Sequence, residues 1–228
     1  MSGKLSIVAT PIGNLEDTTL RALRILKEAD IVACEDTRVS RKLLSHFDIH
    51  TPTVSFHANS GPGGFARVVS LLRQDKHVVY ISDAGTPGVS DPGLELVSTV
   101  REVFGDTVSI ESIPGPSALP AAIAVSGLKA PSFTFYGFLP QKKGRTKLLT
   151  AIATDARAGI FFESPHRILK TLQALAQLLP AERRMGLFRE LTKLHEESLI
   201  GTASELLKIL QDNPEKQRGE FVVIVESQ

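Results

Sequence analysis

The segment 35–38 (EDTR) places two carboxylates and a guanidinium directly after an apolar, strand-like run. Carboxylates can take up a proton, and a guanidinium can hold an anion. Glu35, Asp36 and Arg38 are therefore candidates for acid–base chemistry. The alternative is the solvated start of a helix, in which the acids complement the helix dipole and Arg38 pairs with them.

The motif ESPHR is the corresponding candidate in the second half of the chain, again just after an apolar run. Its reactive side chains are those of Glu163, His166 and Arg167. Here the alternative is a capped helix, with Ser164 as N-cap and Pro165 at the first helical position. The two interpretations of this motif can hold together.

Residues 83–93 (DAGTPGVSDPG) are expected to be a ligand-binding loop. They connect a predicted strand to a predicted helix with eleven residues, where about 2–6 are usual. Three Gly allow positive φ, whereas two Pro fix φ, so the loop is expected to be rigid and shaped. It follows the carboxyl end of a strand, where open α/β sheets bind ligands, which favours this interpretation over an ordinary turn.

Strand-like and helix-like patterns alternate along the chain, which predicts an α/β protein with largely parallel sheets covered by helices. The predicted strands are residues 5–10, 31–34, 54–56, 77–82, 108–113, 133–138, 159–162, 185–189 and 221–225, with 196–200 as an antiparallel candidate. The predicted helices are residues 18–30 (capped by Asp17 or Thr18), 38–47, 65–74, 94–103, 117–126, 146–153 and 168–178. Because parallel strands end at one edge, the loops 10–15, 35–38, 83–93 and 114–118 should converge there and form a cleft.

The length of the chain fits one large domain or two small ones. The chain has 228 residues, 42% of them hydrophobic and 22% charged, as in ordinary globular proteins. A Pro-Gly-Pro turn interrupts the alternation, so a boundary is expected near residues 114–131, giving domains 1–115 and 116–228. The first has a net charge of −3 and the second of +4, which is compatible with a polyanionic partner.

Several classes of protein are disfavoured by the sequence. Cys34 is the single cysteine, which argues against disulfides and cysteine-rich metal sites, and no apolar run approaches the roughly 20 residues of a membrane helix. The chain enters a strand just after Met1, so no secretory signal and a cytoplasmic location are expected. G-x-G-x-x-G, P-loop, H-E-x-x-H and G-x-S-x-G motifs are absent, and no metal site is expected.

Two further sets of residues lie outside these clusters. The histidines His46, His50, His57, His77 and His195 are assigned no role. The basic segment 141–147 (QKKGRTK) comes just after Tyr136 and Phe138. It fits equally a solvated helix start and a surface that binds single-stranded nucleic acid through stacking and phosphate contacts.

Seven segments, taken in order, resemble one known family. They are residues 9–15 (ATPIGNL), 35–38 (EDTR), 82–87 (SDAGTP), 114–118 (PGPSA), 163–167 (ESPHR), 189–193 (RELTK) and 218–221 (RGEF). The chain resembles the 16S ribosomal RNA (cytidine-2'-O)-methyltransferases, which belong to the tetrapyrrole methylase class of enzymes that use S-adenosylmethionine (SAM). The resemblance extends over nearly the whole chain.

This resemblance implies two α/β domains with SAM in the cleft between them and a homodimer. It implies methylation of a cytidine ribose in the decoding region of 16S ribosomal RNA, in the small ribosomal subunit. The implied cofactor residues are Pro11, Ile12, Asp83, Gly85, Thr86, Pro87, Val89, Ser117, Ala118, Phe162, Glu163, Glu220 and Phe221. The candidates for assisting proton loss near the methyl group are Glu35, Asp36, Glu163 and His166, with Arg38 and Arg167 on backbone phosphates.

The chain departs from the wider class in its first loop and from the family at its end. Tetrapyrrole enzymes open with G-x-G-x-G-D, whereas residues 10–14 are TPIGN, which points away from porphyrinoid substrates. The ribosomal enzymes usually continue past the last strand, so RNA contacts made by that extension are expected to be absent here. The alternatives are a small-molecule methyltransferase of the same fold and a non-enzymatic ribosome-assembly factor.

Overall fold

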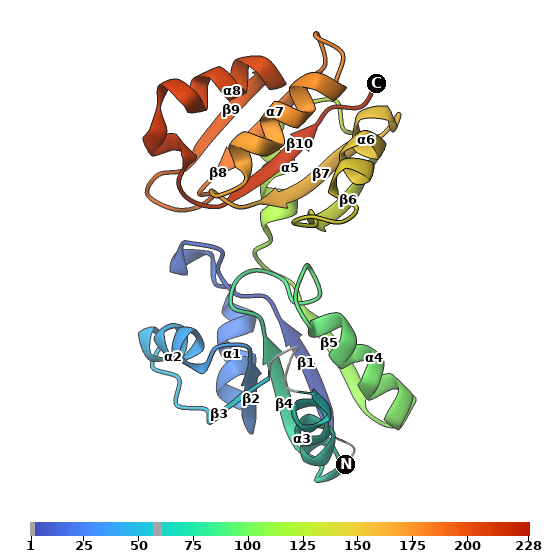
Figure 1. The fold of residues 1–228 in the computed structure, drawn as a ribbon. Coiled ribbons are helices and arrows are strands. Elements are labelled where there is room, and N and C mark those ends of the chain that lie inside the picture. Colours follow the sequence, from blue (N-terminus) through green and yellow to red (C-terminus); the bar gives the residue numbers. More distant parts are fainter. Residues whose placement is uncertain (1–2, 57–60) are drawn as a thin grey trace. The chain divides into compact units, whose positions relative to one another are not determined.

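The computed structural model of the chain describes residues 3–56 and 61–228, so His57 lies outside the described residues. It divides into two compact units, Met1–Ser117 and Ala118–Gln228 (Figure 1). Each unit is a sheet with helices packed on it. The predicted class, α/β with two α/β domains, is confirmed. None of the helices in the described part of the chain has the length and apolar character that crossing a bilayer requires.

The N-terminal unit is a parallel sheet in the order β3-β2-β4-β1-β5. Its strands are β1 (Lys4–Val8), β2 (Ile31–Cys34), β3 (Thr53–Ser55), β4 (His77–Ile81) and β5 (Ser109–Ile113). Its helices are α1 (Leu20–Glu28), α2 (Thr37–His46), α3 (Gly61–Arg73) and α4 (Gly93–Phe104), with a short 3-10 helix, η1 (Leu15–Asp17).

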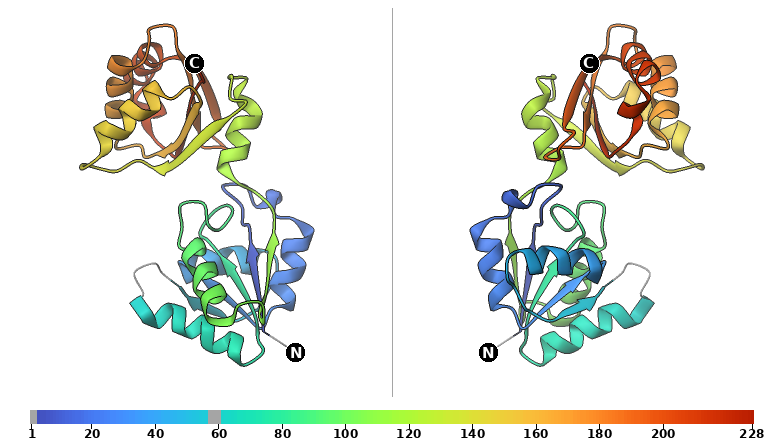
Figure 2. Two further views of the ribbon diagram at one scale, coloured as in Figure 1. Left: turned by 90° about the vertical axis from the view of Figure 1, so that its right-hand side faces the viewer. Right: turned by 90° about the vertical axis from the view of Figure 1, so that its left-hand side faces the viewer.

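Helices cover both faces of this sheet, and its central strand β4 buries apolar side chains on both sides. Val79 and Ile81 of β4 pack with residues of α1 and α2 on one face. Val78 and Tyr80, which alternate with them, pack with residues of α3 and α4 on the other. Figure 2 shows these helices on opposite sides of the sheet. A run of consecutive apolar residues, as in β4, is typical of a buried parallel sheet.

The C-terminal unit is a mixed sheet in the order β6-β7-β10-β8-β9. Its strands are β6 (Phe133–Phe138), β7 (Ala158–Glu163), β8 (Arg184–Arg189), β9 (Glu197–Thr202) and β10 (Phe221–Val225). Its helices are α5 (Ala118–Ser126), α6 (Arg145–Thr154), α7 (Ile168–Leu178) and α8 (Ala203–Asp212), followed by a 3-10 helix, η3 (Pro214–Gln217). Figure 2 shows α6, α7 and α8 on one face and α5 on the other.

Strand pairing in this unit differs from a largely parallel sheet. β6 pairs with β7 in parallel, but β10 is antiparallel to both of its neighbours. The antiparallel candidate at 196–200 is confirmed as β9, which pairs with β8. Helix α8 was not predicted, although Thr202 and Glu205 form a capping box at its start, which is a recognisable sequence signal.

Two predicted helix caps are wrong. Thr19, rather than Asp17 or Thr18, caps α1, and its side chain accepts a hydrogen bond from Ala22 N at 3.1 Å. Ser164 does not cap α7, whose N-cap is Arg167. The carbonyl of Ser164 instead accepts from the amides of Arg167 and Ile168, at 3.0 and 3.1 Å, so a turn precedes the helix.

Candidate functional site

The loop 83–93 is hydrogen-bonded to two other candidate loops through its first half. Thr10 and Gly85 exchange backbone hydrogen bonds of 2.9 and 3.0 Å. The hydroxyl of Thr86 donates to the carbonyl of Pro116 at 3.0 Å. Ile12 lies so close to Gly85 that a Cβ added there would be 3.2 Å from its Cγ2. The first, third and fourth loops therefore meet at one edge of the sheet.

Two carboxylates join the segment 35–38 to the same loop. Glu35 Oε1 accepts from the amide of Asp83 at 3.3 Å, and Asp83 Oδ1 accepts from the amide of Asp36 at 2.9 Å. These bonds link the ends of β2 and β4, which are neighbours in the sheet. The predicted convergence of the four loops is confirmed within the N-terminal unit.

Asp91 determines the shape of the second half of the loop. Its carboxylate accepts from the amide of Gly88 at 2.8 and 2.9 Å, from that of Val89 at 3.2 Å and from that of Gly93 at 2.7 Å. Gly85 and Gly88 have φ values of 81° and 91°, which residues other than glycine rarely adopt. A Cβ at Gly93 would lie 2.8 Å from both Asp91 Oδ1 and Gly88 N, so no larger residue fits without a shift.

Asp36 and Arg38 form the helix-start arrangement that was the alternative for this segment. Asp36 caps α2 by accepting from the amide of Arg38 at 2.8 Å, and their side chains form an ion pair of 2.6 Å. The hydrogen bond from the Arg38 side chain holds the pKa of Asp36 well below its usual range. A carboxylate with such a low pKa is a weak proton acceptor. The Arg38 side chain is 86% exposed, which leaves it accessible to an anion.

Glu163 lies at the end of β7 with its side chain fully buried. One oxygen accepts from Arg145 Nη2 at 2.8 Å and from the Thr171 hydroxyl at 2.6 Å. The other accepts from the amide of Ser164 at 2.8 Å and forms an ion pair with Arg167 Nε at 2.8 Å, whose N–H donates to Ser164 Oγ at 3.1 Å. A buried carboxylate with three hydrogen-bond donors and a second guanidinium in ion-pair contact suits an anchor better than a base, because both oxygens are already committed.

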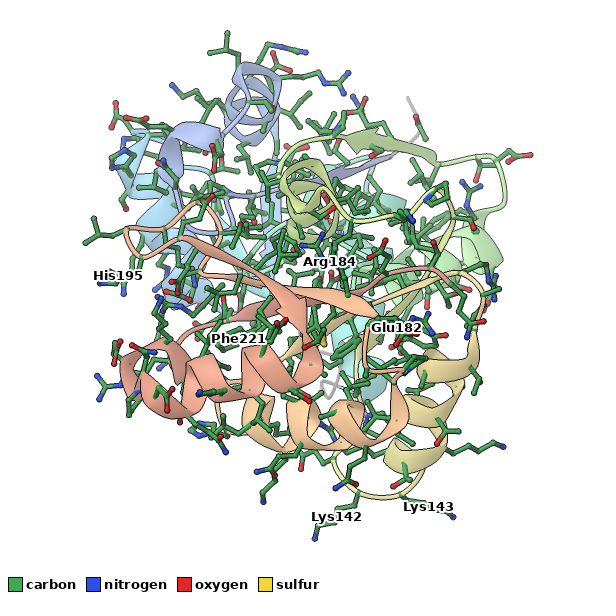
Figure 3. All side chains as sticks on the ribbon, turned by 90° about the horizontal axis from the view of Figure 1, so that it is seen from above. Lys142, Lys143, Glu182, Arg184, His195 and Phe221 are labelled. Atoms are coloured by element: carbon green, nitrogen blue, oxygen red, sulfur yellow. The ribbon has the colours of Figure 1, made fainter. Side chains whose placement is uncertain are left out.

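The remaining candidates of the C-terminal unit differ in how deeply their side chains are buried. Phe221 begins β10 opposite Glu163 and is 2% exposed, so its side chain belongs to the helix-covered core (Figure 3). Phe162 is half-buried and its ring packs edge-on to two other aromatic rings. His166 is exposed in the turn before α7. Ser117 and Ala118 lie on either side of the division between the units.

Glu190 fixes the turn that contains Glu220. Its amide donates to the carbonyl of Glu220 at 3.0 Å, and its Oε1 accepts from the amide of Glu220 at 2.9 Å. The Lys193 ammonium bridges the two carboxylates at 2.9 and 2.7 Å. Glu190 and Thr192 have positive φ values of 51° and 66° without being glycine. Such conformations cost free energy and cluster at functional sites.

Four residues that organise the site were not singled out from the sequence. Asp91 precedes a Pro-Gly pair, which is a turn signal that could have identified it. Arg145, Thr171 and Glu190 act through partners that are distant in the chain, so no local pattern reveals them. In residues 3–56 and 61–228, no group of three or more His, Cys, Asp or Glu could hold a metal ion.

The chain is similar in sequence to a family of known proteins over most of its length. Residues 4–207 match the family described as Tetrapyrrole (Corrin/Porphyrin) Methylases. "Ribosomal RNA small subunit methyltransferase I" of Thermotoga maritima is 41% identical over 223 residues, which cover 98% of each chain. The protein of that name from Coprothermobacter proteolyticus is 44% identical, covering 96% of this chain and 95% of its own. The Bacillus subtilis protein of that name is 41% identical, and the match covers 98% of this chain and 75% of the Bacillus protein.

Solved structures show the same fold. The methyltransferase CobJ superposes with a TM-score of 0.72 at 19% identity, covering 99% of this chain and 95% of its own. Uroporphyrin-III C-methyltransferase from Thermus thermophilus, complexed with S-adenyl homocysteine, gives a TM-score of 0.66 at 19% identity. The match covers 97% of this chain and 96% of that one. The chain therefore belongs to the tetrapyrrole methylase family, and it is a methyltransferase.

Proposed function

We propose that this protein transfers a methyl group from SAM to the 2'-hydroxyl of a cytidine in the decoding region of 16S ribosomal RNA, in the small ribosomal subunit. The observation that carries the proposal is the 41–45% identity over nearly the full length to enzymes named for small-subunit ribosomal RNA. The TPIGN loop in place of a Gly-rich opening supports RNA over a porphyrinoid acceptor.

The loop 83–93 fits a cofactor of this kind. Gly88 is exposed with positive φ, and among the described residues the nearest atom to a Cβ added there is Leu94 N, at 3.9 Å. A ligand can therefore approach the backbone at Gly88. SAM, when bound, supplies an electrophilic methyl group. In the N-terminal unit we assign its binding to the side chains or backbone of Pro11, Ile12, Asp83, Gly85, Thr86, Pro87, Val89 and Ser117. In the C-terminal unit we assign it to Ala118, Phe162, Glu163, Glu220 and Phe221.

The protein's part in the reaction is to align the ribose hydroxyl and assist loss of its proton. Alignment is a proximity effect that needs no metal ion. Glu35 and His166 are better placed to accept the proton than Asp36, whose pKa is depressed, or Glu163, which is buried and fully bonded. Arg38, being exposed, is assigned to a backbone phosphate, whereas Arg167 is committed to Glu163.

The test is transfer of tritiated methyl groups from SAM to small ribosomal subunits that lack the modification. The expected product is 2'-O-methylcytidine in a single RNA fragment after nuclease digestion. Transfer to a precorrin acceptor instead would favour the small-molecule alternative. Absence of SAM binding in calorimetry would favour a non-enzymatic assembly factor.

The proposal includes a cytoplasmic homodimer with domains 1–115 and 116–228, in which the second completes the SAM site. Sedimentation equilibrium of the purified protein tests the dimer. A monomer at micromolar concentration would contradict that part and leave the methyltransferase activity unaffected.

A further inference from the structure

The loop between β6 and α6 carries a concentration of unopposed positive charge. Residues 132–154 contain no Asp or Glu. Lys142 and Lys143 in this loop and Lys147 at the start of α6 are exposed, and Figure 3 shows Lys142 and Lys143 extending away from the body of the unit. An acid-free cationic loop is suited to contact a polyanion.

A bulge in β6 places an aromatic ring next to this loop. Gly137 has φ of 60°, and the pairing of β6 with β7 shifts register between Phe135 and Phe138. The extra residue turns Phe138 to the same face as Phe135, so that both rings pack edge-on to Phe162, at 5.4 and 5.0 Å between centroids. Bulges of this type redirect side chains, and here the result is a braced ring that is 57% exposed.

The backbone between the ring and the lysines is held in place by the Glu163 network. Arg167 Nη1 donates to the carbonyl of Leu139 at 2.8 Å, and Arg145 Nη1 donates to that of Pro140 at 3.1 Å. Both guanidiniums are bound to the buried Glu163 carboxylate. Because the loop is already ordered, a ligand that binds there loses little free energy in ordering it.

We propose that Phe138, Lys142, Lys143 and Lys147, the 138–147 surface, bind a single-stranded segment of the substrate RNA beside the methylated nucleotide. An exposed ring stacks on an unpaired base while neighbouring lysines contact phosphates, which is how single strands are held without sequence preference. This inference rests on the proposed function and names the part of the chain that holds RNA outside the reacting nucleotide. It also gives Glu163 and Arg167 a task as positioning residues.

The first experiment reverses two charges. The double variant Lys142→Glu with Lys143→Glu is compared with Lys170→Glu with Lys208→Glu, whose lysines are exposed on α7 and α8. Methyl transfer to unmodified small subunits should show KM raised by about 10-fold or more in the first variant only, with kcat and SAM affinity unchanged. In the first variant, the slope of log KM against log salt concentration should be smaller by about 1.4, since two phosphate contacts are lost.

The second experiment removes the ring. Phe138→Ala should raise KM about 5- to 100-fold, and Phe138→Tyr should restore it, because either aromatic ring can stack. Leu194→Ala is the matched control, since Leu194 is a 93% exposed apolar residue of the same unit.

The outcomes separate this surface from the proposed function. If the wild-type protein transfers no methyl group to RNA, the proposed function and this surface both fail. If it does, and KM is the same in the lysine variant and its control, the surface alone is refuted. A change in oligomeric state in the Phe138→Ala variant would identify the surface as a contact between copies and would also overturn it.

Discussion

At the scale of single residues, the structure separates carboxylates that shape the protein from those that can take part in chemistry. Asp91 and Glu163 each accept several hydrogen bonds from fixed donors, so their role is to hold backbone in place. Glu35 lies where two loops meet, and His166 is exposed. The sequence marks Glu35, Glu163 and His166 as candidates without ranking them, because their ranking depends on partners far along the chain.

Removing the Glu163 carboxylate should destabilise the protein strongly. Glu163→Ala leaves two half-buried guanidiniums without their partner, a loss of about 3–5 kcal/mol, and Glu163→Gln should lose less because it keeps the shape. Glu182→Ala, at an exposed position visible in Figure 3, is the control and should change stability by less than about 0.5 kcal/mol. Urea denaturation measures the difference.

Kinetics distinguish the two roles of Glu163. If Glu163 acts as an anchor of the 138–147 surface, the change Glu163→Gln should raise KM for ribosomal subunits and leave kcat nearly unchanged in the folded protein. A fall in kcat of about 100-fold with unchanged KM would point instead to proton transfer by Glu163.

Adding one methyl group at Gly93 should disturb the loop 83–93. Gly93→Ala forces a Cβ to within 2.8 Å of Asp91 Oδ1 and Gly88 N, so we expect a loss of about 1–3 kcal/mol and weaker SAM binding in calorimetry. Gly63→Ala is the control, because no atom of the described residues lies within 4 Å of a Cβ added there inside α3, and it should gain about 0.5–1 kcal/mol. Equal effects of the two changes would contradict the close packing at Gly93.

At the scale of elements, the starts of the parallel strands carry their own polar cluster. The Ser6 hydroxyl donates to Glu111 at 2.6 Å and lies 2.7 Å from His77 Nε2, so this nitrogen carries the proton in the neutral ring. Lys4 pairs with Glu111 at 2.7 Å, and the amide of His77 donates to Asp30 at 2.8 Å. The cluster links β1, β4 and β5 at the edge opposite the candidate site.

This cluster predicts stability that rises with pH. Burial, with Lys4 nearby, lowers the pKa of His77 from 6.5, so its contribution is present above that pH and is lost as the pH falls through the folded-state pKa. The hydrogen bond from the His77 amide lowers the pKa of Asp30 from 3.8. Burial opposes a similar fall in the pKa of Glu111 from 4.5, but the hydrogen bonds from Lys4 and Ser6 outweigh it. Both carboxylates therefore contribute above these values.

Urea denaturation between pH 8 and pH 3 measures these losses. The wild-type free energy of unfolding should fall in two stages, the first beginning near pH 6.5 and the second near pH 4.5. In a His77→Gln variant the first stage should be weaker and the second should remain. A first stage of undiminished size in that variant would show that His77 is not its source.

At the scale of the whole molecule, the chain contains separate hydrophobic cores in its two units. Separate cores allow separate unfolding, so scanning calorimetry of the protein alone should give a calorimetric enthalpy larger than the van't Hoff enthalpy. If SAM contacts both units, saturating SAM should merge the two transitions and raise their midpoint temperature. A SAM concentration of about 100 times the dissociation constant adds roughly 2.7 kcal/mol to the free energy of unfolding. One two-state transition in the absence of SAM would contradict this expectation.

The sequence by itself determined the alternation of strands and helices, the parallel first sheet, the loops at its carboxyl edge and the family. These features follow from local periodicity, turn residues and short motifs, which are readable without knowing the partners of each residue. Only the tertiary structure decided that Asp36 caps a helix, that Glu163 anchors a loop with Arg145 and Thr171, and that Phe138 is turned outward by a bulge. Hydrogen bonds and burial between distant segments fix these roles, and no local pattern encodes them.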